Sequence, residues 1–323
     1  MLNGPLPQLP TVMQAVRIHA YGDPSVLRLD EIAIPAPGAG ELLVKVVAAS
    51  VNPVDWKIRE GWLKDSLPHA LPLTLGWDLS GVVVAKGSGA RRFDPGDAVF
   101  ARPDIVRDGS YAEYIVVREA EVAAKPATIS HVEAATLPLA GITAWQAIVA
   151  IGNVQKGQRV LVHAGAGGVG TLAVQLARWR GAQVMATASA SNRSLITSLG
   201  ATEVIDYRET SFTEVARDID LVVDTIGGAT QRDSWSVLKP GGLLVSLVSP
   251  PDRNCPQAES RRGVYLFIEP DAAVLDALAA LVDGGELRPV VGAEFALADA
   301  ARAHELSRSG RARGKIALYV GEP

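Results

Sequence analysis

Hydrophobic and polar residues divide the chain into two stretches with different patterns. In residues 14 to about 125, short β-branched runs alternate with turn-forming segments such as Pro35–Gly38 and Asp94–Asp97. Runs separated in this way are typical of antiparallel strands joined by tight turns. They lie at Leu42–Val47, Gly81–Ala85, Ala98–Ala101 and Tyr114–Val117, after a first strand at Gln14–His19. We therefore expect this stretch to form a compact antiparallel β-barrel.

From about Val132 the pattern changes to helical stretches that alternate with apolar strands. This alternation predicts βαβ units and a parallel sheet, and hence an α/β fold. Leu221–Asp224 is apolar on both faces, as expected for a strand covered by helices on each side. The predicted strands are Val160–His163, Gln183–Thr187, Glu203–Tyr207, Leu221–Thr225 and Gly242–Leu247.

The two ends of the chain differ from the segments beside them. Met1–Val12 contains three prolines and no Lys or Arg, so it lacks the basic and apolar regions of a signal peptide. We expect it to be a loose extension before the first strand. At the other end, a helix predicted over Leu297–Arg308 precedes a final strand at Lys315–Val320. We expect that strand to rejoin the first lobe.

A glycine cluster directly follows the apolar run Val160–His163. It reads Ala164-Gly165-Ala166-Gly167-Gly168-Val169-Gly170, and a helix is predicted after it over Thr171–Arg180. Glycine permits a positive φ and a close approach of phosphate, and the free N–H groups of a new helix favour an anion. A glycine pattern alone is weak evidence, but the flanking strand and helix supply the required context. A dinucleotide diphosphate is therefore expected at Gly165, Gly167, Gly168, Val169 and Gly170; the alternative is a structural turn without a ligand.

The residues after the second strand of the parallel sheet favour NADP over NAD. An NAD site usually has Asp or Glu near this point, where it binds the ribose 2′-hydroxyl. Residues 171–202 contain no Asp or Glu, and the strand ends at Ser189, with Arg193 beyond it. A hydroxyl and a guanidinium suit a 2′-phosphate, so we predict that Ser189 and Arg193 bind it. Taken alone, Arg193 would be read as a solvated charge at a helix start.

Composition and charge narrow the choice of partners. The 323 residues include 31 Lys and Arg and 35 Asp and Glu, a formal net charge of −4, with no basic block. Nucleic acid and membrane surfaces are therefore not expected as partners. The single cysteine excludes an intrachain disulfide and a Cys-rich zinc site. The length favours two lobes, and a cytoplasmic location is the default expectation.

Segments along nearly the whole chain resemble one family in the same order: Tyr21–Leu27, Ala48–Asp55, Leu75–Gly81, Leu137–Ala144, the glycine cluster, Ser198–Ala201, Val204–Tyr207 and Arg313–Lys315. The chain is similar to the zinc-free quinone oxidoreductases (zeta-crystallin-like) among the medium-chain dehydrogenases/reductases. The resemblance implies a GroES-like β-barrel catalytic domain over residues 1–134, completed by 271–323. It implies a Rossmann domain with a doubly wound parallel sheet over 135–270. It also implies NADP(H) as cofactor, a cleft between the domains, and a homodimer, commonly formed through the Rossmann sheets.

The resemblance adds residues at both ends of the cofactor. Asn52 and Thr143 match positions near the nicotinamide and its ribose. Tyr207 matches a position that helps to hold the adenosine end; without the resemblance it would be read as an aromatic at a strand end. Arg313 lies in the segment that matches the C-terminal strand returning to the cofactor.

The ligands that zinc-dependent relatives require are missing from the sequence. Those relatives need a cysteine and a His–Glu pair in the first lobe, but the matching segments read Asn52-Pro53-Val54-Asp55 and Gly76-Trp77-Asp78. A catalytic zinc needs three suitable protein ligands, and an indole is not one of them. No metal is therefore expected. Without a Lewis acid, the expected hydride acceptor is a quinone or an α,β-unsaturated carbonyl, because the product anion is delocalised.

Lys57, on a short helix predicted over Val54–Glu60, is the candidate catalytic residue. In some enone reductases of the family, a lysine at the matching place lies beside the nicotinamide ribose. There it could stabilise developing negative charge or orient the cofactor. The alternative is an exposed lysine with neither role. The proton would come from water or from a nearby side chain.

Three functions are compatible with these patterns. The first is an NADPH-dependent oxidoreductase acting on quinones or enones. The second is an enoyl-thioester or polyketide-tailoring reductase, for which Arg261-Arg262 is a small basic cluster that could also be a solvated loop. The third is a non-catalytic NADPH-binding protein.

Overall fold

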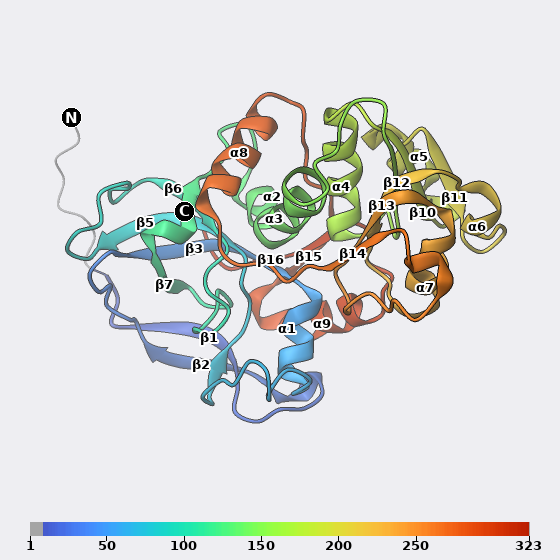
Figure 1. Ribbon diagram of the computed structural model, residues 1–323. Coiled ribbons are helices and arrows are strands. Elements are labelled where there is room, and N and C mark those ends of the chain that lie inside the picture. The colour runs from blue at the N-terminus through green and yellow to red at the C-terminus, as the bar shows by residue number, and fades with distance from the viewer. Residues whose placement is uncertain (1–8, 323) are drawn as a thin grey trace.

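A six-stranded parallel sheet forms one half of the molecule (Figure 1). The computed structural model describes residues 9–322 and orders these strands β11-β10-β9-β12-β13-β14. They are β9 (Arg159–Val162), β10 (Gln183–Ala188), β11 (Glu203–Asp206), β12 (Ile219–Asp224), β13 (Leu238–Ser246) and β14 (Arg262–Tyr265). The chain passes from β9 to β10 on one side and later to β12 on the other. The carboxyl ends of β9 and β12 therefore frame the crevice in which sheets of this kind bind ligands.

Helices cover both faces of this sheet. Val160 and Val162 pack into one core, whereas Leu161 between them packs into a second core together with Trp235. Burial on both faces explains why these strands are continuously apolar. The first face carries α3 (Pro138–Trp145), α4 (Gly168–Trp179) and α5 (Arg193–Leu199); the second carries α6 (Phe212–Val215) and α7 (Gly228–Val237). α8 (Ala272–Asp283) packs against α3 and against β8 (Val122–Ala124) of the other half. The doubly wound arrangement is confirmed.

The β-rich half contains two further sheets. One orders β15-β16-β3-β5-β6-β8 with β7 paired to β3, and the other orders β2-β1-β4. All their strand pairs are antiparallel except β15 with β16. The strands are β1 (Val12–Ile18), β2 (Leu27–Ala33), β3 (Glu41–Val51), β4 (Leu73–Thr74), β5 (Leu79–Lys86), β6 (Ala98–Ala101), β7 (Tyr114–Arg118), β8 (Val122–Ala124), β15 (Val291–Ala296) and β16 (Lys315–Tyr319). The predicted antiparallel pairing is present, divided between two sheets.

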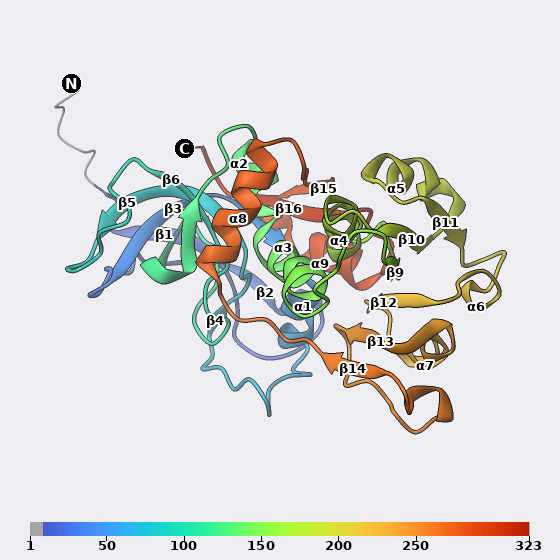
Figure 2. The ribbon, with the colours of Figure 1, turned by 45° about the horizontal axis from the view of Figure 1, so that its top comes forward.

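The C-terminal segment returns to the first lobe, as the sequence predicted. Ala317 of β16 lies opposite Ser50 of β3. The predicted helix before it begins as a 3₁₀ turn at Leu297–Asp299 and continues as α9 (Ala300–Arg308), which packs against α1 (Pro53–Arg59). Figure 2 shows the chain between β14 and α8 crossing from the parallel sheet to the β-rich half, where α2 (His131–Ala135) also lies.

Several boundaries differ from those that the sequence predicted. The first strand is Val12–Ile18, and α4 begins at Gly168, inside the glycine cluster. The sequence pattern missed β14 because this partly exposed edge strand lacks a continuous apolar run; it also missed β15 and α8.

Residues 1–8 of the predicted N-terminal extension lie outside the described residues. None of the helices in residues 9–322 has the length and apolarity needed to cross a membrane.

Candidate functional site

The glycine cluster forms the turn between β9 and α4, and its glycines are required by close packing. A Cβ on Gly170 would lie 2.2 Å from the carbonyl oxygen of Ala164, and one on Gly165 would lie 2.8 Å from the Cβ of Ala186. The positive φ that we expected at a glycine is instead taken by Ala164, at 49°. That expectation was wrong, because the glycines here serve the close contact of strand and helix.

The first turn of α4 presents unpaired backbone donors. Gly167 is the N-cap and has no side chain with which to cap the helix. The N–H groups of Gly168, Val169 and Gly170 therefore have no partner within the helix. Together with the helix dipole, these groups make the turn suited to a diphosphate.

The C-terminal strand lies directly against this turn. Gly314 forms a parallel bridge with Gly167 and donates its N–H to the carbonyl of Ala166 at 2.7 Å. A Cβ on Gly168 would lie 2.8 Å from the Cδ of Lys315, so the lysine stem packs against the glycine. Arg313, predicted to contact the cofactor, is exposed beside this contact. The structure therefore joins the two halves of the molecule at the predicted diphosphate position.

The ammonium group of Lys315 is buried and fully engaged. Its Nζ donates to the carbonyl of Val51 at 3.1 Å, to Asp78 Oδ2 at 3.2 Å and to Asn52 Oδ1. The residue is 5% exposed. A lysine has three N–H donors, so these contacts use all of them. The sequence named the segment around Lys315 but not its ammonium as a functional group.

Asp78 gathers polar groups from several elements at one carboxylate. Its Oδ2 accepts from the Ser50 hydroxyl at 2.7 Å and from Asn52 Nδ2 at 2.8 Å. Its Oδ1 accepts from the N–H of Leu139 at 2.6 Å, and the Thr143 hydroxyl donates to the carbonyl of Leu139 at 2.7 Å. The predicted residues Asn52 and Thr143 are thus brought to one cluster. The signal for Asp78 was an acid between apolar residues at a strand start.

A second buried carboxylate caps α1. Asp55 Oδ2 accepts from the N–H of Asn52 at 2.8 Å and from the Tyr111 hydroxyl at 2.7 Å. Burial raises the pKa of Asp55 to about 7. Its Oδ1 is enclosed and has no hydrogen-bond partner among residues 9–322. This capping fixes Asn52 at the start of α1 and thereby places the helix.

The Asp55 contact continues into a chain of polar groups. The Tyr111 hydroxyl lies 3.3 Å from His304 Nε2, and His304 Nδ1 lies 3.1 Å from Arg59 Nη1. Burial lowers the pKa of His304 to about 3, so its imidazole is neutral. Arg59 pairs with Glu60 at 2.5 Å. This chain ties α1 to α9 through buried polar contacts.

Lys57, the predicted catalytic residue, lies one turn into α1. Burial lowers the pKa of its ammonium. Its Nζ lies 5.8 Å from the ring centroid of Trp56, which packs edge-on against Trp62 at 5.2 Å. Trp62 is 63% exposed. Lys57 therefore has an aromatic neighbour and no hydrogen-bonded partner in the described part of the chain.

The residues predicted for the adenosine end gather at the carboxyl ends of β10 and β11. Tyr207 is 60% exposed, and Arg208 lies over its ring at 5.7 Å. Ser189 directly follows β10, and Arg193, the first residue of α5, donates to the carbonyl of Val204 at 2.9 Å. No sequence pattern singled out Arg208.

The nearest acid to this end is already occupied. Asp206 Oδ2 accepts from the N–H of Ala190 at 2.7 Å, and its Oδ1 accepts from the N–H of Arg208 at 3.0 Å. Both oxygens of Asp206 therefore accept hydrogen bonds from backbone N–H groups, one in each of two loops. Ser189, Arg193, Tyr207 and Arg208 offer hydroxyl, aromatic and basic groups at this end, and 2′-phosphate binding there stays a prediction.

The residues in the zinc-ligand segments do not fit a metal. Trp77 is fully buried and donates its indole N–H to the carbonyl of Arg107 at 3.1 Å. In residues 9–322, no three His, Cys, Asp or Glu side chains gather as metal ligands. His163 is enclosed between Thr187 at 3.3 Å and Ser234 at 3.0 Å, and burial lowers its pKa to about 4.

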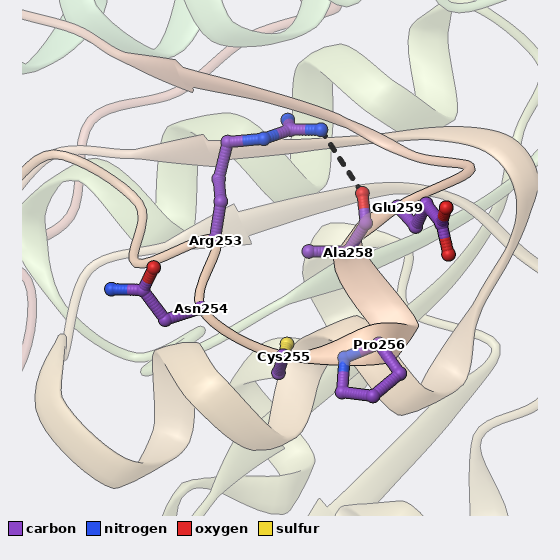
Figure 3. Close-up of a pocket in the computed structure, with 6 residues that line it drawn as sticks. All are labelled: Arg253, Asn254, Cys255, Pro256, Ala258 and Glu259. Atoms are coloured by element: carbon purple, nitrogen blue, oxygen red, sulfur yellow. Dashed lines mark hydrogen bonds between the residues drawn. The ribbon is translucent and has the colours of Figure 1, made fainter.

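A surface pocket of about 540 Å³ lies in the loop between β13 and β14 (Figure 3). It is lined by Arg253, Asn254, Cys255, Pro256, Ala258 and Glu259. Arg253 already donates to the carbonyl of Ala258 at 3.0 Å and lies over the Trp235 ring. None of the predicted site residues lines this pocket. The candidate site therefore consists of the glycine turn and the Asp78 cluster, not of this pocket.

Two family models match the chain. An alcohol dehydrogenase GroES-like domain matches residues 38–127, and a zinc-binding dehydrogenase domain matches residues 199–318. A mitochondrial NAD(P)H oxidoreductase of Danio rerio is 35% identical, with 97% of this chain and 92% of that protein covered. A 2-methylene-furan-3-one reductase of Solanum lycopersicum is 34% identical, with 96% and 80% covered.

Solved structures agree with these relatives. A quinone oxidoreductase from Coxiella burnetii has a TM-score of 0.89 and 36% identity, with 96% of this chain and 99% of that chain covered. The Escherichia coli quinone oxidoreductase, solved as a complex with NADPH, has a TM-score of 0.86 and 28% identity, with 95% and 100% covered. The parallel sheet, the GroES-like half and these relatives place the chain in the quinone oxidoreductase family of the medium-chain dehydrogenases/reductases.

Proposed function

We propose that this protein is an NADPH-dependent oxidoreductase that reduces a quinone or an α,β-unsaturated carbonyl without a metal ion. The observation that carries the proposal is the contact between the glycine turn and the buried cluster of Asn52, Asp78 and Lys315. This contact supports the proposal because a turn suited to a diphosphate lies next to fixed charges, in segments where zinc-dependent relatives have ligands. When bound, NADPH supplies the hydride.

The cofactor is NADP(H) in this proposal. The NADPH complex of the E. coli relative and the NAD(P)H activity in the Danio rerio relative's name support it. The free N–H groups of Gly168, Val169 and Gly170 would hold the diphosphate. Gly165 and Gly167 would shape the turn, because their own N–H groups already donate to the carbonyls of Thr187 and Ala164. Ser189, Arg193 and Tyr207 would hold the adenosine end, and Asn52, Thr143 and Arg313 the remainder. The acid-free end of β10 supports NADPH over NADH.

The acceptor would be a conjugated carbonyl compound. Relatives are named for quinones and for 2-methylene-furan-3-one, which is an enone. Reduction of such an acceptor leaves a delocalised anion, which needs less stabilisation than an alkoxide. Lys57, a half-buried cation without a hydrogen-bonded partner in residues 9–322, would stabilise that charge or orient the cofactor.

NADPH oxidation at 340 nm tests the proposal directly. Purified protein should oxidise NADPH with 1,4-benzoquinone or cyclohex-2-enone, and more slowly with crotonyl thioester. Preference for the thioester would favour the enoyl-thioester alternative, and NADPH binding without turnover on any acceptor would favour a non-catalytic protein. Lys57→Met should lower turnover relative to a surface change, Lys156→Met, at an exposed lysine; equal turnover would remove Lys57 from the chemistry.

The remaining features of the proposal concern the whole chain. We propose the domain bounds 1–134, 135–270 and 271–323, a cytoplasmic location and a homodimer. β14 is the last strand of its sheet and pairs on one side only within residues 9–322, which supports a dimer through this edge. Light scattering of purified protein would measure the dimer, and fractionation would test the location, because the Danio rerio relative is mitochondrial.

A further inference from the structure

Arg102 is a buried arginine with too few partners. It directly follows β6 and is 2% exposed. Within residues 9–322, its one hydrogen bond runs from Nη2 to the carbonyl of Ile268 at 3.4 Å, and its enclosed Nε has no partner. A guanidinium stays charged in proteins and has five N–H donors. Burying a charge without partners is costly, so its presence here calls for a function.

Arg102 lies between the Asp78 cluster and the chain that crosses the two halves. Leu79 pairs with Ala101, so the next residues along the two strands, Asp78 and Arg102, are neighbours across β5 and β6. Burial lowers the pKa of Arg102, and the charge of Asp78 is the largest influence opposing that shift. On its other side, Ile268 belongs to the segment between β14 and α8 (Figure 2).

One nitrogen of this guanidinium is left for a ligand. Nη2 is bonded to Ile268, and Nε is enclosed. Nη1 has no hydrogen bond in the described chain and is not among the enclosed unpaired atoms. Lys315, the neighbouring cation, cannot donate to a ligand, because its three N–H donors are already used.

We propose that Arg102 binds the carbonyl oxygen of the acceptor and stabilises the negative charge that develops there during reduction. This inference rests on the proposed function. With an enone, the β-carbon receives hydride and its two electrons, the C=C electrons move toward the carbonyl, and the oxygen becomes an enolate. Water then supplies the proton to the α-carbon, which balances the reduction. Preorganised donors aimed at such an oxygen are among the strongest catalytic devices in enzymes.

The test compares Arg102→Met with Arg17→Met. Arg17 is a matched control: it donates to one carbonyl, that of Pro72, at 2.7 Å, and its Nε is also enclosed without a partner. It lies on β1, in the three-stranded sheet away from the Asp78 cluster. Arg102→Met should keep or raise the Tm, because methionine removes a buried unpaired charge.

The expected kinetic result is selective. Arg102→Met should lower kcat with cyclohex-2-enone about 10²-fold, the usual cost of losing one oxyanion donor. The loss with 1,4-benzoquinone should be much smaller, because its product anion is less basic and needs less stabilisation. Arg17→Met should change neither rate. Equal losses on both acceptors together with a lower Tm would show a structural role and overturn the inference.

A binding measurement separates this inference from the proposed function. 4-Nitrophenol, titrated into protein saturated with NADP⁺, should bind as the yellow phenolate at lower pH in wild type than in Arg102→Met. Identical titration curves for the two proteins would overturn the role of Arg102. If the wild type reduces neither acceptor, the proposed function fails, while this titration still decides whether Arg102 binds an oxyanion.

Discussion

The two ends of the candidate site, the glycine turn and the Asp78 cluster, use different kinds of polar group. At the glycine turn, the donors are backbone N–H groups within a seven-residue segment, and the glycines around them are fixed by close contacts. At the Asp78 cluster, the polar groups are side chains of Asn52, which follows β3, of Asp78, which precedes β5, and of Lys315 on β16. They lie up to 263 residues apart in sequence. Backbone donors do not titrate, whereas the side-chain end depends on charge. Substitutions at the glycine turn should therefore act through steric clashes. Substitutions at the Asp78 cluster should act through lost charge, with effects that depend on pH.

Removing the cation of the side-chain end should have the largest effect. Lys315→Met leaves the buried Asp78 carboxylate without its ion partner, so unfolding free energy should fall by about 3–5 kcal/mol. Urea denaturation measures this loss. The double variant Lys315→Met/Asp78→Asn should recover part of it, since the stranded charge is gone. Strict additivity of the two single changes would show that the pair is not coupled.

Asp55 should make the stability of the side-chain end depend on pH. Its folded pKa, about 7, is above its ordinary value of 3.8, so the folded state holds a proton that the unfolded state releases. Its contribution is therefore fully present below pH 3.8 and is lost as pH rises to about 7, by about 4 kcal/mol at 1.36 kcal/mol per pKa unit. Asp55→Asn should remove this fall.

Urea melts of wild type and Asp55→Asn between pH 5 and 8 measure the difference. Using the difference between the two proteins cancels groups that titrate in both, such as His304, whose depressed pKa acts in the opposite direction. Parallel curves over this range would show that Asp55 is ionised in the folded protein. That result would weaken the contrast between the two ends.

A substitution at the glycine turn should lower stability and NADPH binding through a steric clash alone. Gly170→Ala puts a Cβ 2.2 Å from the Ala164 carbonyl, so we expect a stability loss of about 1–3 kcal/mol together with weaker NADPH binding. Gly321→Ala is the control, because a Cβ there meets nothing within 4 Å. Calorimetry and NADPH titration at pH 6 and 8 should give the same loss. A loss that changes with pH would contradict a steric cause.

The smallest expected effect concerns cofactor choice. Arg193→Ala should raise the KM for NADPH about tenfold more than that for NADH, because a hydrogen bond to a charged group contributes about 1.5–3 kcal/mol. Steady-state kinetics with both cofactors measure this ratio. Arg217→Ala, a change of an exposed arginine after α6, serves as the control. Equal changes in both KM values would remove Arg193 from 2′-phosphate binding.

The same contrast explains how much the sequence predicted. The parallel sheet and the glycine turn follow from local patterns, and the structure bears them out. The meeting of Asp78 with Lys315 depends on β16 pairing with β3, which no local pattern encodes. Arg102 gave no signal beyond a charge after an apolar strand. The positive φ was assigned to glycine because propensity favours it, but packing placed it at Ala164.

We propose that fixed side-chain charges, and not a metal ion, serve the acceptor end. The direct measurement is quinone-dependent NADPH oxidation by chelator-dialysed protein, with the zinc content of the same sample determined by mass spectrometry. We expect full turnover in protein that holds far less than one zinc per chain, with no gain when zinc is added. Turnover that rises in proportion to bound zinc would contradict it.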